Sequence, residues 1–213
     1  YNAKAGAEKI VIYDEESDTS NIRHLTLTGE LRQAIESEII QVAYQPIVDL
    51  STGHIHAVEA LARWKHPKLG DIHPTEFIAQ AERTGMIQPL TAHVLDAAIK
   101  QLQRWKEEGN RFKLSFNLSP RILHDEHFSL ALKGAIDNAS INEADLILEI
   151  TETAIFLDPD NAMRILSQLR DMGISIAIDD FGTGYSSLSY LQKMPLSYLK
   201  IVQSFIRDLD TKT

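Results

Sequence analysis

Residues 146–180 read LILEITETAIFLDPDNAMRILSQLRDMGISIAIDD, and this stretch predicts one complete strand–helix–strand unit. Its two ends, 146–150 and 174–178, are apolar and rich in β-branched residues, as strands buried on both faces are. The Asp-Pro pair at 158–159 is typical of a helix start, because aspartate accepts bonds from free N–H groups and proline fits the first turn. The helix is expected to end at Gly173. The unit therefore indicates a parallel sheet with helices packed on it.

The same alternation extends through most of the chain. A short turn at 51–53 separates the first two predicted strands, which favours a hairpin. Six strands are predicted in all, whereas a closed β/α barrel has eight. If the chain forms a barrel, about two strand–helix units are missing from it. A doubly wound open sheet would be complete with six strands, but it usually carries a glycine-rich first turn that this chain lacks. The further strands are expected at 42–50, 56–64, 113–118 and 198–201, and the further helices at 29–39, 75–84, 90–108, 128–138 and 188–192.

Composition excludes several classes of protein. The 213 residues include 21 Lys and Arg against 30 Asp and Glu, which gives a net charge of −9 and makes general binding of DNA unfavourable. Cysteine is absent, which excludes a disulfide scaffold, a thiolate metal site and a cysteine nucleophile, and which suits a reducing cytoplasm. The sequence contains no apolar run long enough to span a membrane. These features are typical of a globular domain.

Acidic or amide side chains lie at or near the ends of successive predicted strands, at Glu59, Asn117, Glu149, Asp179 and Asp180. A β/α unit is on the order of 30 residues long, and these positions follow that spacing except where two helices fill the first gap. Because the carboxyl ends of barrel strands meet at one rim, we expect these side chains to lie close together. Such a concentration of negative charge requires hard cations, and an all-oxygen set favours Mg²⁺ or Mn²⁺.

Lys200 ends the last predicted strand, where it would hold an attacking water or neutralise a phosphate oxygen. Two metal ions about 3.5–4 Å apart are a standard clamp for phosphodiester cleavage. The glycine- and serine-rich segment 181–187 is typical of a mobile gating loop. Taken singly, each of these residues is more often structural than functional, so the prediction depends on their joint placement.

The histidines do not show the spacing of a metal-ligand pair. Four of them are expected in loops or on the surface, and the two tryptophans in the core or on a partner surface. These residues are His54, His56, His66 and His73, and Trp64 and Trp105.

Six motifs in fixed order over about residues 29–207 resemble the EAL domain family of cyclic di-GMP phosphodiesterases. They are Tyr44-Gln45-Pro46-Ile47, Glu59-Ala60-Leu61-Ala62-Arg63-Trp64, Phe116-Asn117-Leu118-Ser119, Glu149-Ile150-Thr151-Glu152, Asp179-Asp180-Phe181-Gly182-Thr183-Gly184-Tyr185-Ser186-Ser187 and Leu199-Lys200-Ile201.

The resemblance implies a TIM-like (β/α) barrel with an antiparallel first strand, which hydrolyses cyclic di-GMP to linear pGpG with two Mg²⁺ or Mn²⁺ ions. It also implies a role for each matching residue. The first metal would be ligated by Glu59, Asn117, Glu149 and Asp179, and the second by Asp179 and Asp180. The catalytic residues would be Glu59, Lys200 and Asp180, with Lys200 orienting the water. The nucleotide would be contacted by Gln45, Leu61 and Arg63, and the loop at 181–187 would be supported by Glu152, Gly182 and Gly184.

Two departures from the family pattern favour an alternative. Val202 stands where the family usually has an aspartate, and residues i and i+2 of a strand face the same side. The C-terminal strands are expected to be absent, together with a metal-ligating glutamate and a substrate-contacting glutamine. The alternative is therefore a degenerate EAL domain that binds cyclic di-GMP as a receptor, or an interaction module without catalysis.

The chain is expected to divide into three parts. Residues 1–14 resemble the end of a GGDEF domain, residues 15–28 have the composition of a linker, and residues 29–213 form a C-terminally incomplete EAL domain. The expected partners are cyclic di-GMP, a second copy in a homodimer formed through the barrel loops, and an N-terminal GGDEF or sensor domain, without DNA. The expected location is cytoplasmic, with any membrane anchor in a sensor region outside this chain.

Overall fold

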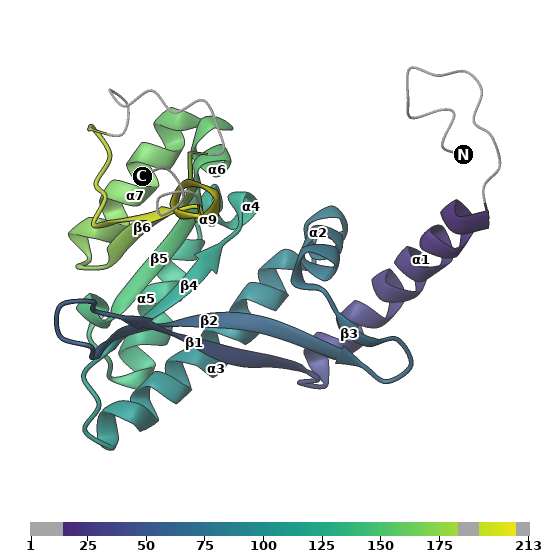
Figure 1. Ribbon diagram of the computed structural model, residues 1–213, viewed down its shortest axis with the longest axis horizontal. Helices are drawn as coiled ribbons and strands as arrows, with labels where there is room; N and C mark the ends of the chain where they lie inside the picture. The colour runs from purple at the N-terminus through teal and green to yellow at the C-terminus, as the bar shows by residue number, and fades with distance from the viewer. Residues whose placement is uncertain (1–14, 183–191, 208–213) are drawn as a thin grey trace.

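The computed structural model describes residues 15–182 and 192–207, which form an α/β fold built on one sheet (Figure 1). Within these residues no helix is both long and apolar enough to cross a membrane. The strands are β1 (Ile40–Val48), β2 (Ile55–His66), β3 (Gly70–Ile72), β4 (Lys113–Leu118), β5 (Leu146–Thr151), β6 (Ser175–Phe181) and β7 (Tyr198–Ile201). The helices are α1 (Glu15–Glu36), α2 (Pro74–Thr84), α3 (Ile87–Glu107), α4 (Pro120–Leu123), α5 (Phe128–Ala139), the 3-10 helix η2 (Glu143–Asp145), α6 (Glu152–Phe156), α7 (Pro159–Asp171) and α9 (Gln203–Ile206).

The sheet has the strand order β1-β2-β4-β5-β6-β7, with β3 paired to β2. The hairpin of β1 and β2 is antiparallel, as predicted, and the strands from β2 through β7 run parallel along the main path. This is the architecture of a TIM-like barrel with a reversed first strand. The barrel is not closed among the described residues, because β1 and β7 remain the two edges of the sheet.

The two faces of the sheet differ in chemistry because successive strand side chains point in opposite directions. Even-numbered side chains such as Phe116, Leu148 and Ile176 are buried in the main core together with side chains of the helices. Odd-numbered side chains of β1, β2, β4, β5 and β6 lie on the opposite, inner face, together with the even-numbered side chains of β7. There Ala57, Ile147 and Ala177 form a small second apolar cluster with Ile47 and Tyr198. The helical face therefore stabilises the fold and leaves the inner face for polar residues.

The helix signals act where the sequence predicts them. The carboxylate of Asp158 accepts a hydrogen bond from the Asn161 N–H at the start of α7, with Pro159 at the first position. Gly173 follows the helix with a φ of +99°, a left-handed conformation that favours glycine. These two residues fix the length of α7 and return the chain to the sheet at β6.

Several predicted boundaries are wrong. The helix expected at 29–39 begins at Glu15, so the polar stretch at 15–28 is helical. Its second half docks on the domain through buried Leu27 and Leu31, and its first half extends away from the sheet (Figure 1). The short strand β3 and the helices α4, α6 and α9 were not predicted. Residues 1–14 and most of the helix expected at 188–192 lie outside the described residues.

His66 is buried, contrary to the prediction of a loop or surface residue, and is only 2% exposed. Its Nδ1 accepts hydrogen bonds from the N–H groups of Lys68 and Leu69, both at 3.1 Å, so Nε2 carries the proton and donates to Glu30 at 2.6 Å. His66 thereby joins the end of β2 to α1. Trp64 is a core residue, and Trp105 packs against the core.

Candidate functional site

Strand register brings the predicted polar residues to one face of the sheet. Glu59 lies opposite Ser115, Asn117 opposite Glu149, and Glu149 opposite Ala177, so these side chains share the inner face. Asp179 and Lys200 lie two residues beyond Ala177 and Tyr198, which also face each other. Five residues from five strands therefore meet near the carboxyl ends of the parallel strands: Glu59, Asn117, Glu149, Asp179 and Lys200.

The ammonium group of Lys200 lies at the centre of this cluster. Its Nζ is 3.1 Å from Glu59 Oε2 and 3.4 Å from Asp179 Oδ2, and it forms a close ion pair with Glu149 Oε2. Three carboxylates thus face one positive charge. Their formal charges exceed that of the lysine, which leaves a negative excess on the inner face.

Two neutral groups hold the carboxylates from the side. The Asn117 amide donates to Glu59 Oε1 at 2.7 Å, and the Ser115 hydroxyl donates to Glu149 Oε1 at 2.6 Å. Ser115 was not among the predicted site residues. Its signal was present in the sequence, because it lies two positions before Asn117 and therefore shares that residue's face of the strand.

The pKa values of Glu149 and Lys200 are both raised in the fold. Burial raises the pKa of Glu149, while the hydrogen bonds from Lys200 and Ser115 oppose that rise. Burial opposes the charged form of Lys200, but its bond to Glu149 and the nearby carboxylates raise its pKa above the ordinary value. Lys200 therefore remains a cation at neutral pH.

Asp180 lies at the exposed end of the cluster. Its φ of +54° is in the left-handed region, and its N–H donates to Asp179 Oδ1 at 2.9 Å. The left-handed φ and the register shift between Ile178 and Phe181 interrupt the regular strand, so the two adjacent acidic residues need not alternate. Gly182 follows with a φ of +102° and lies directly against the ring of Phe205.

The three residues expected to contact a nucleotide come from the β1–β2 hairpin. Gln45 is exposed and lies opposite Glu59 in the antiparallel register, which places it beside the cluster. Leu61 is half-buried, and Arg63 is exposed with its guanidinium donating to the Ala62 carbonyl at 2.9 Å. All three have odd numbers and share the inner face with Glu59.

The residues expected to support the loop are only partly described. Glu152 is 3% exposed at the start of α6, and neither of its carboxylate oxygens has a hydrogen-bond partner among the described residues. Gly184 lies outside the described residues. Val202 follows the end of β7, is half-buried, and accepts the Phe205 N–H through its carbonyl at 3.0 Å.

The donor chemistry of the cluster suits a hard cation, since it consists of carboxylate and amide oxygens. In the described part of the chain, however, no three His, Asp or Glu side chains are grouped as metal ligands. Lys200, Ser115 and Asn117 engage oxygens of Glu59 and Glu149. An ion would have to share these oxygens with the lysine.

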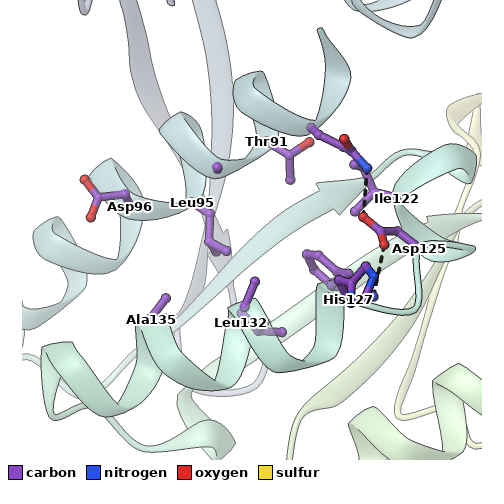
Figure 2. Close-up of a pocket in the computed structure, with 12 residues that line it drawn as sticks. Thr91, Leu95, Asp96, Ile122, Asp125, His127, Leu132 and Ala135 are labelled. Carbon is purple, nitrogen blue, oxygen red and sulfur yellow. Dashed lines mark hydrogen bonds between the residues drawn. The ribbon is translucent and has the colours of Figure 1, made fainter. Parts of the chain in front are cut away.

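A separate hollow of about 430 Å³ lies between α3 and α5 (Figure 2). Its lining is mainly apolar and includes Leu95, Ile122 and Leu132, with a hydrogen bond of 2.9 Å from Gln88 to Asp125 at its edge. None of the predicted site residues lines it. The chemistry at the strand ends therefore marks the candidate site, and this hollow does not.

Comparison with known proteins identifies the family. The EAL domain model matches residues 28–213. The bifunctional diguanylate cyclase/cyclic di-GMP phosphodiesterase MucR of Pseudomonas aeruginosa is 40% identical over 213 residues, which cover 98% of this chain and 31% of MucR. The chain spans between 24% and 34% of the first curated relatives that it matches.

Solved structures agree with this result. The structure of PaMucR phosphodiesterase in complex with c-di-GMP matches with a TM-score of 0.82 and 41% identity, over 87% of this chain and 75% of that chain. The FimX EAL domain from Pseudomonas aeruginosa bound to c-di-GMP matches with a TM-score of 0.77 and 25% identity, over 86% of this chain and 74% of that chain. The chain therefore belongs to the EAL domain family.

Proposed function

We propose that this chain hydrolyses cyclic di-GMP to linear pGpG with the help of two Mg²⁺ or Mn²⁺ ions. The observation that carries the proposal is the convergence of Glu59, Glu149 and Asp179 on Lys200 at one end of the sheet, with Asn117 bonded to Glu59. The similarity to a phosphodiesterase structure with c-di-GMP bound supports the choice of substrate.

The residues would divide the work by position. Glu59, Asn117, Glu149 and Asp179 would hold one ion, and Asp179 and Asp180 the other. Asn117 would present its side-chain carbonyl oxygen, the acceptor end of the amide, to the ion. When bound, the ions would lower the pKa of a bound water toward about 7 and stabilise the attacking and leaving oxygens.

The protein's own groups would bind and orient the reactants. Lys200 would hold the attacking water through its Nζ, because its raised pKa keeps it a donor and not a base. Arg63 would meet a phosphate with its planar guanidinium, and Gln45 and Leu61 would contact the nucleotide from the same hairpin. The exposure of Gln45 and Arg63 supports this assignment.

Glu152 would support the loop that follows the acidic pair. A buried carboxylate without partners is costly, and Glu152 has none among the described residues. We propose that Glu152 supports the loop at 181–187 together with Gly182 and Gly184. A homodimer formed through these loops, and a preceding GGDEF or sensor domain in a cytoplasmic parent protein, belong to the same proposal. The double activity named for MucR supports the tandem arrangement.

A direct test compares Glu59→Ala with Glu36→Ala, an exposed glutamate in an ion pair on α1. Both proteins are incubated with cyclic di-GMP and Mn²⁺, and pGpG is quantified by chromatography. We expect Glu59→Ala to lose hydrolysis at least a hundredfold with an unchanged circular dichroism spectrum, and Glu36→Ala to match the wild type. Full activity of Glu59→Ala would refute the assigned role.

A receptor without catalysis is the second candidate, and Val202 favours it. The aspartate usual two residues after the lysine would add charge near the cluster, and valine does not. In this case calorimetry would detect binding of cyclic di-GMP while chromatography detects no pGpG. Measurable turnover would exclude this candidate.

A further inference from the structure

We propose that Ser115 is a positioning residue, which fixes the buried carboxylate of Glu149 so that one oxygen faces the acidic cluster. Ser115 lies on β4 with 0% exposure, and Glu149 lies on the neighbouring β5 with 1%. The hydroxyl donates to Glu149 Oε1 at 2.6 Å, and the Ile147 carbonyl lies 3.4 Å from the same hydroxyl. The proposal rests on the function proposed above.

The two oxygens of Glu149 have separate partners. Oε1 accepts from Ser115, and Oε2 faces the Lys200 ammonium. A glutamate side chain has three rotatable bonds, so one fixed oxygen removes most of its freedom to turn. The hydroxyl thereby determines which oxygen is presented to the cluster and at what angle.

Within residues 15–182 and 192–207, the hydrogen bond recorded on Glu149 Oε1 comes from Ser115. The inner-face neighbours toward the other end of the strands are Ala57, Ile147 and Ala177, which form the small apolar cluster. Without the hydroxyl, Oε1 would be buried and unpaired, a costly arrangement. Glu149 would then rotate toward Lys200, and this change withdraws an oxygen from an incoming cation.

The effect should therefore appear first in cation affinity. Groups that orient a metal ligand commonly contribute 10- to 100-fold to affinity or activity, so about that loss is expected here. Gln45 lies on β1 and Arg63 lies near the end of β2. The recorded hydrogen bonds of the Ser115 hydroxyl go to Ile147 and Glu149 and to neither of these two residues. The KM for the nucleotide should consequently stay within about twofold while kcat falls.

The test compares Ser115→Ala with Ser115→Thr, which keeps the hydroxyl, and with Ser175→Ala. Ser175 lies on β6, and its hydroxyl accepts a hydrogen bond from Lys113 at 3.2 Å. Ser175→Ala therefore removes the same hydroxyl group as Ser115→Ala, but away from the acidic cluster. Binding of Mn²⁺ is measured by electron paramagnetic resonance without nucleotide, and kcat and KM are measured with cyclic di-GMP. We expect a 10- to 100-fold weaker Mn²⁺ affinity and lower kcat for Ser115→Ala alone.

An equal Mn²⁺ affinity of Ser115→Ala and Ser175→Ala would overturn the proposal. If the wild type binds Mn²⁺ but does not hydrolyse the nucleotide, the proposed function fails while the affinities still decide the role of Ser115. If it binds no Mn²⁺, crystal structures of the wild type and Ser115→Ala decide it. Displacement of the Glu149 carboxylate by more than about 1 Å supports the proposal, and superposition overturns it.

Discussion

Lys200 and Glu59 are separated by 141 positions in the chain, yet their Nζ and Oε2 atoms lie 3.1 Å apart. The contact joins β7 to β2 across the inner face of the sheet, where Glu149 and Asp179 face the same ammonium. One lysine therefore compensates carboxylates from three strands. This arrangement couples the stability of the domain to the chemistry of its candidate site.

Replacement of Lys200 by methionine should destabilise the domain, because it leaves buried Glu149 beside two other carboxylates without a counter-charge. Breaking such a buried pair costs about 3 kcal/mol. We expect that loss in urea unfolding with EDTA, and partial recovery in millimolar Mn²⁺, since a divalent cation would replace the ammonium.

The matched control is Lys113→Met, which removes a lysine from the same face near Ser175 and Tyr198. It should respond little to Mn²⁺. The Lys200 pKa is raised in the fold, so its stabilising effect is complete below its ordinary value of 10.5 and fades as the pH rises above it. The difference between wild type and Lys200→Met should therefore shrink above pH 10.5, and a constant difference would contradict the ion-pair explanation.

Substitution of Gly182 by alanine should strain the backbone beside the acidic pair. Its φ of +102° disfavours a side chain, and a Cβ would meet the Phe205 ring. The positive φ alone costs about 1–2 kcal/mol in unfolding free energy. Adding Phe205→Ala should relieve the steric part only. Gly134→Ala is the control: Gly134 lies within α5, where a Cβ meets nothing within 4 Å, and alanine there should stabilise by about 0.5–1 kcal/mol.

Truncation of His66 to alanine should loosen α1. The N–H groups of Lys68 and Leu69 would lose their acceptor and Glu30 its donor, at a cost of about 2 kcal/mol. Urea unfolding measures the loss, and hydrogen exchange should show faster exchange in the second half of α1. Glu30→Gln keeps an acceptor for Nε2 and should have a much smaller effect. If His66→Ala and Glu30→Gln reduced the free energy of unfolding equally, the negative charge of Glu30, and not the hydrogen bonds of the His66 ring, would account for the stabilisation.

Asp49, in the turn between β1 and β2, should titrate at an unusually low pH. Hydrogen bonds from Ser51 and Thr52 lower the pKa of Asp49 from its ordinary 3.8 to about 2. The stabilisation from these bonds is present above pH 3.8 and is lost as the pH falls toward 2. Carboxyl ¹³C chemical shifts should give a midpoint near 2. In Ser51→Ala, which removes the largest contribution, the midpoint should move back toward 3.8.

The parallel part of the fold was predictable because the period of each strand determines which side chains face the helices. The strand at Lys113–Leu118 matches its predicted bounds. The odd-numbered positions of β2, β4, β5 and β6 carry Glu59, Asn117, Glu149 and Asp179. Joint placement of Glu59, Asn117 and Glu149 followed from the same regularity. Their ligand roles remain predictions, as do those of Asp179 and Asp180.

Other features depend on tertiary contacts that a local pattern does not contain. The polar composition of residues 15–28 suggested a linker, but Leu27 finds a buried place on the domain and supports a longer helix. His66 is buried because three partners satisfy its ring. The bond from Ser115 to Glu149 depends on the pairing of β4 with β5, although the position of Ser115 two residues before Asn117 already places it on the same face.

The reversal of β1 changes where the chain enters the barrel. In an all-parallel barrel, the segment before the first strand arrives at the end opposite the active site. Here Ile40 pairs with Trp64, near the carboxyl end of β2, so α1 arrives at the end of the hairpin that lies beyond Glu59. A movement or rotation of α1 would therefore act on the end of the sheet that carries the acidic cluster, and not on the opposite end.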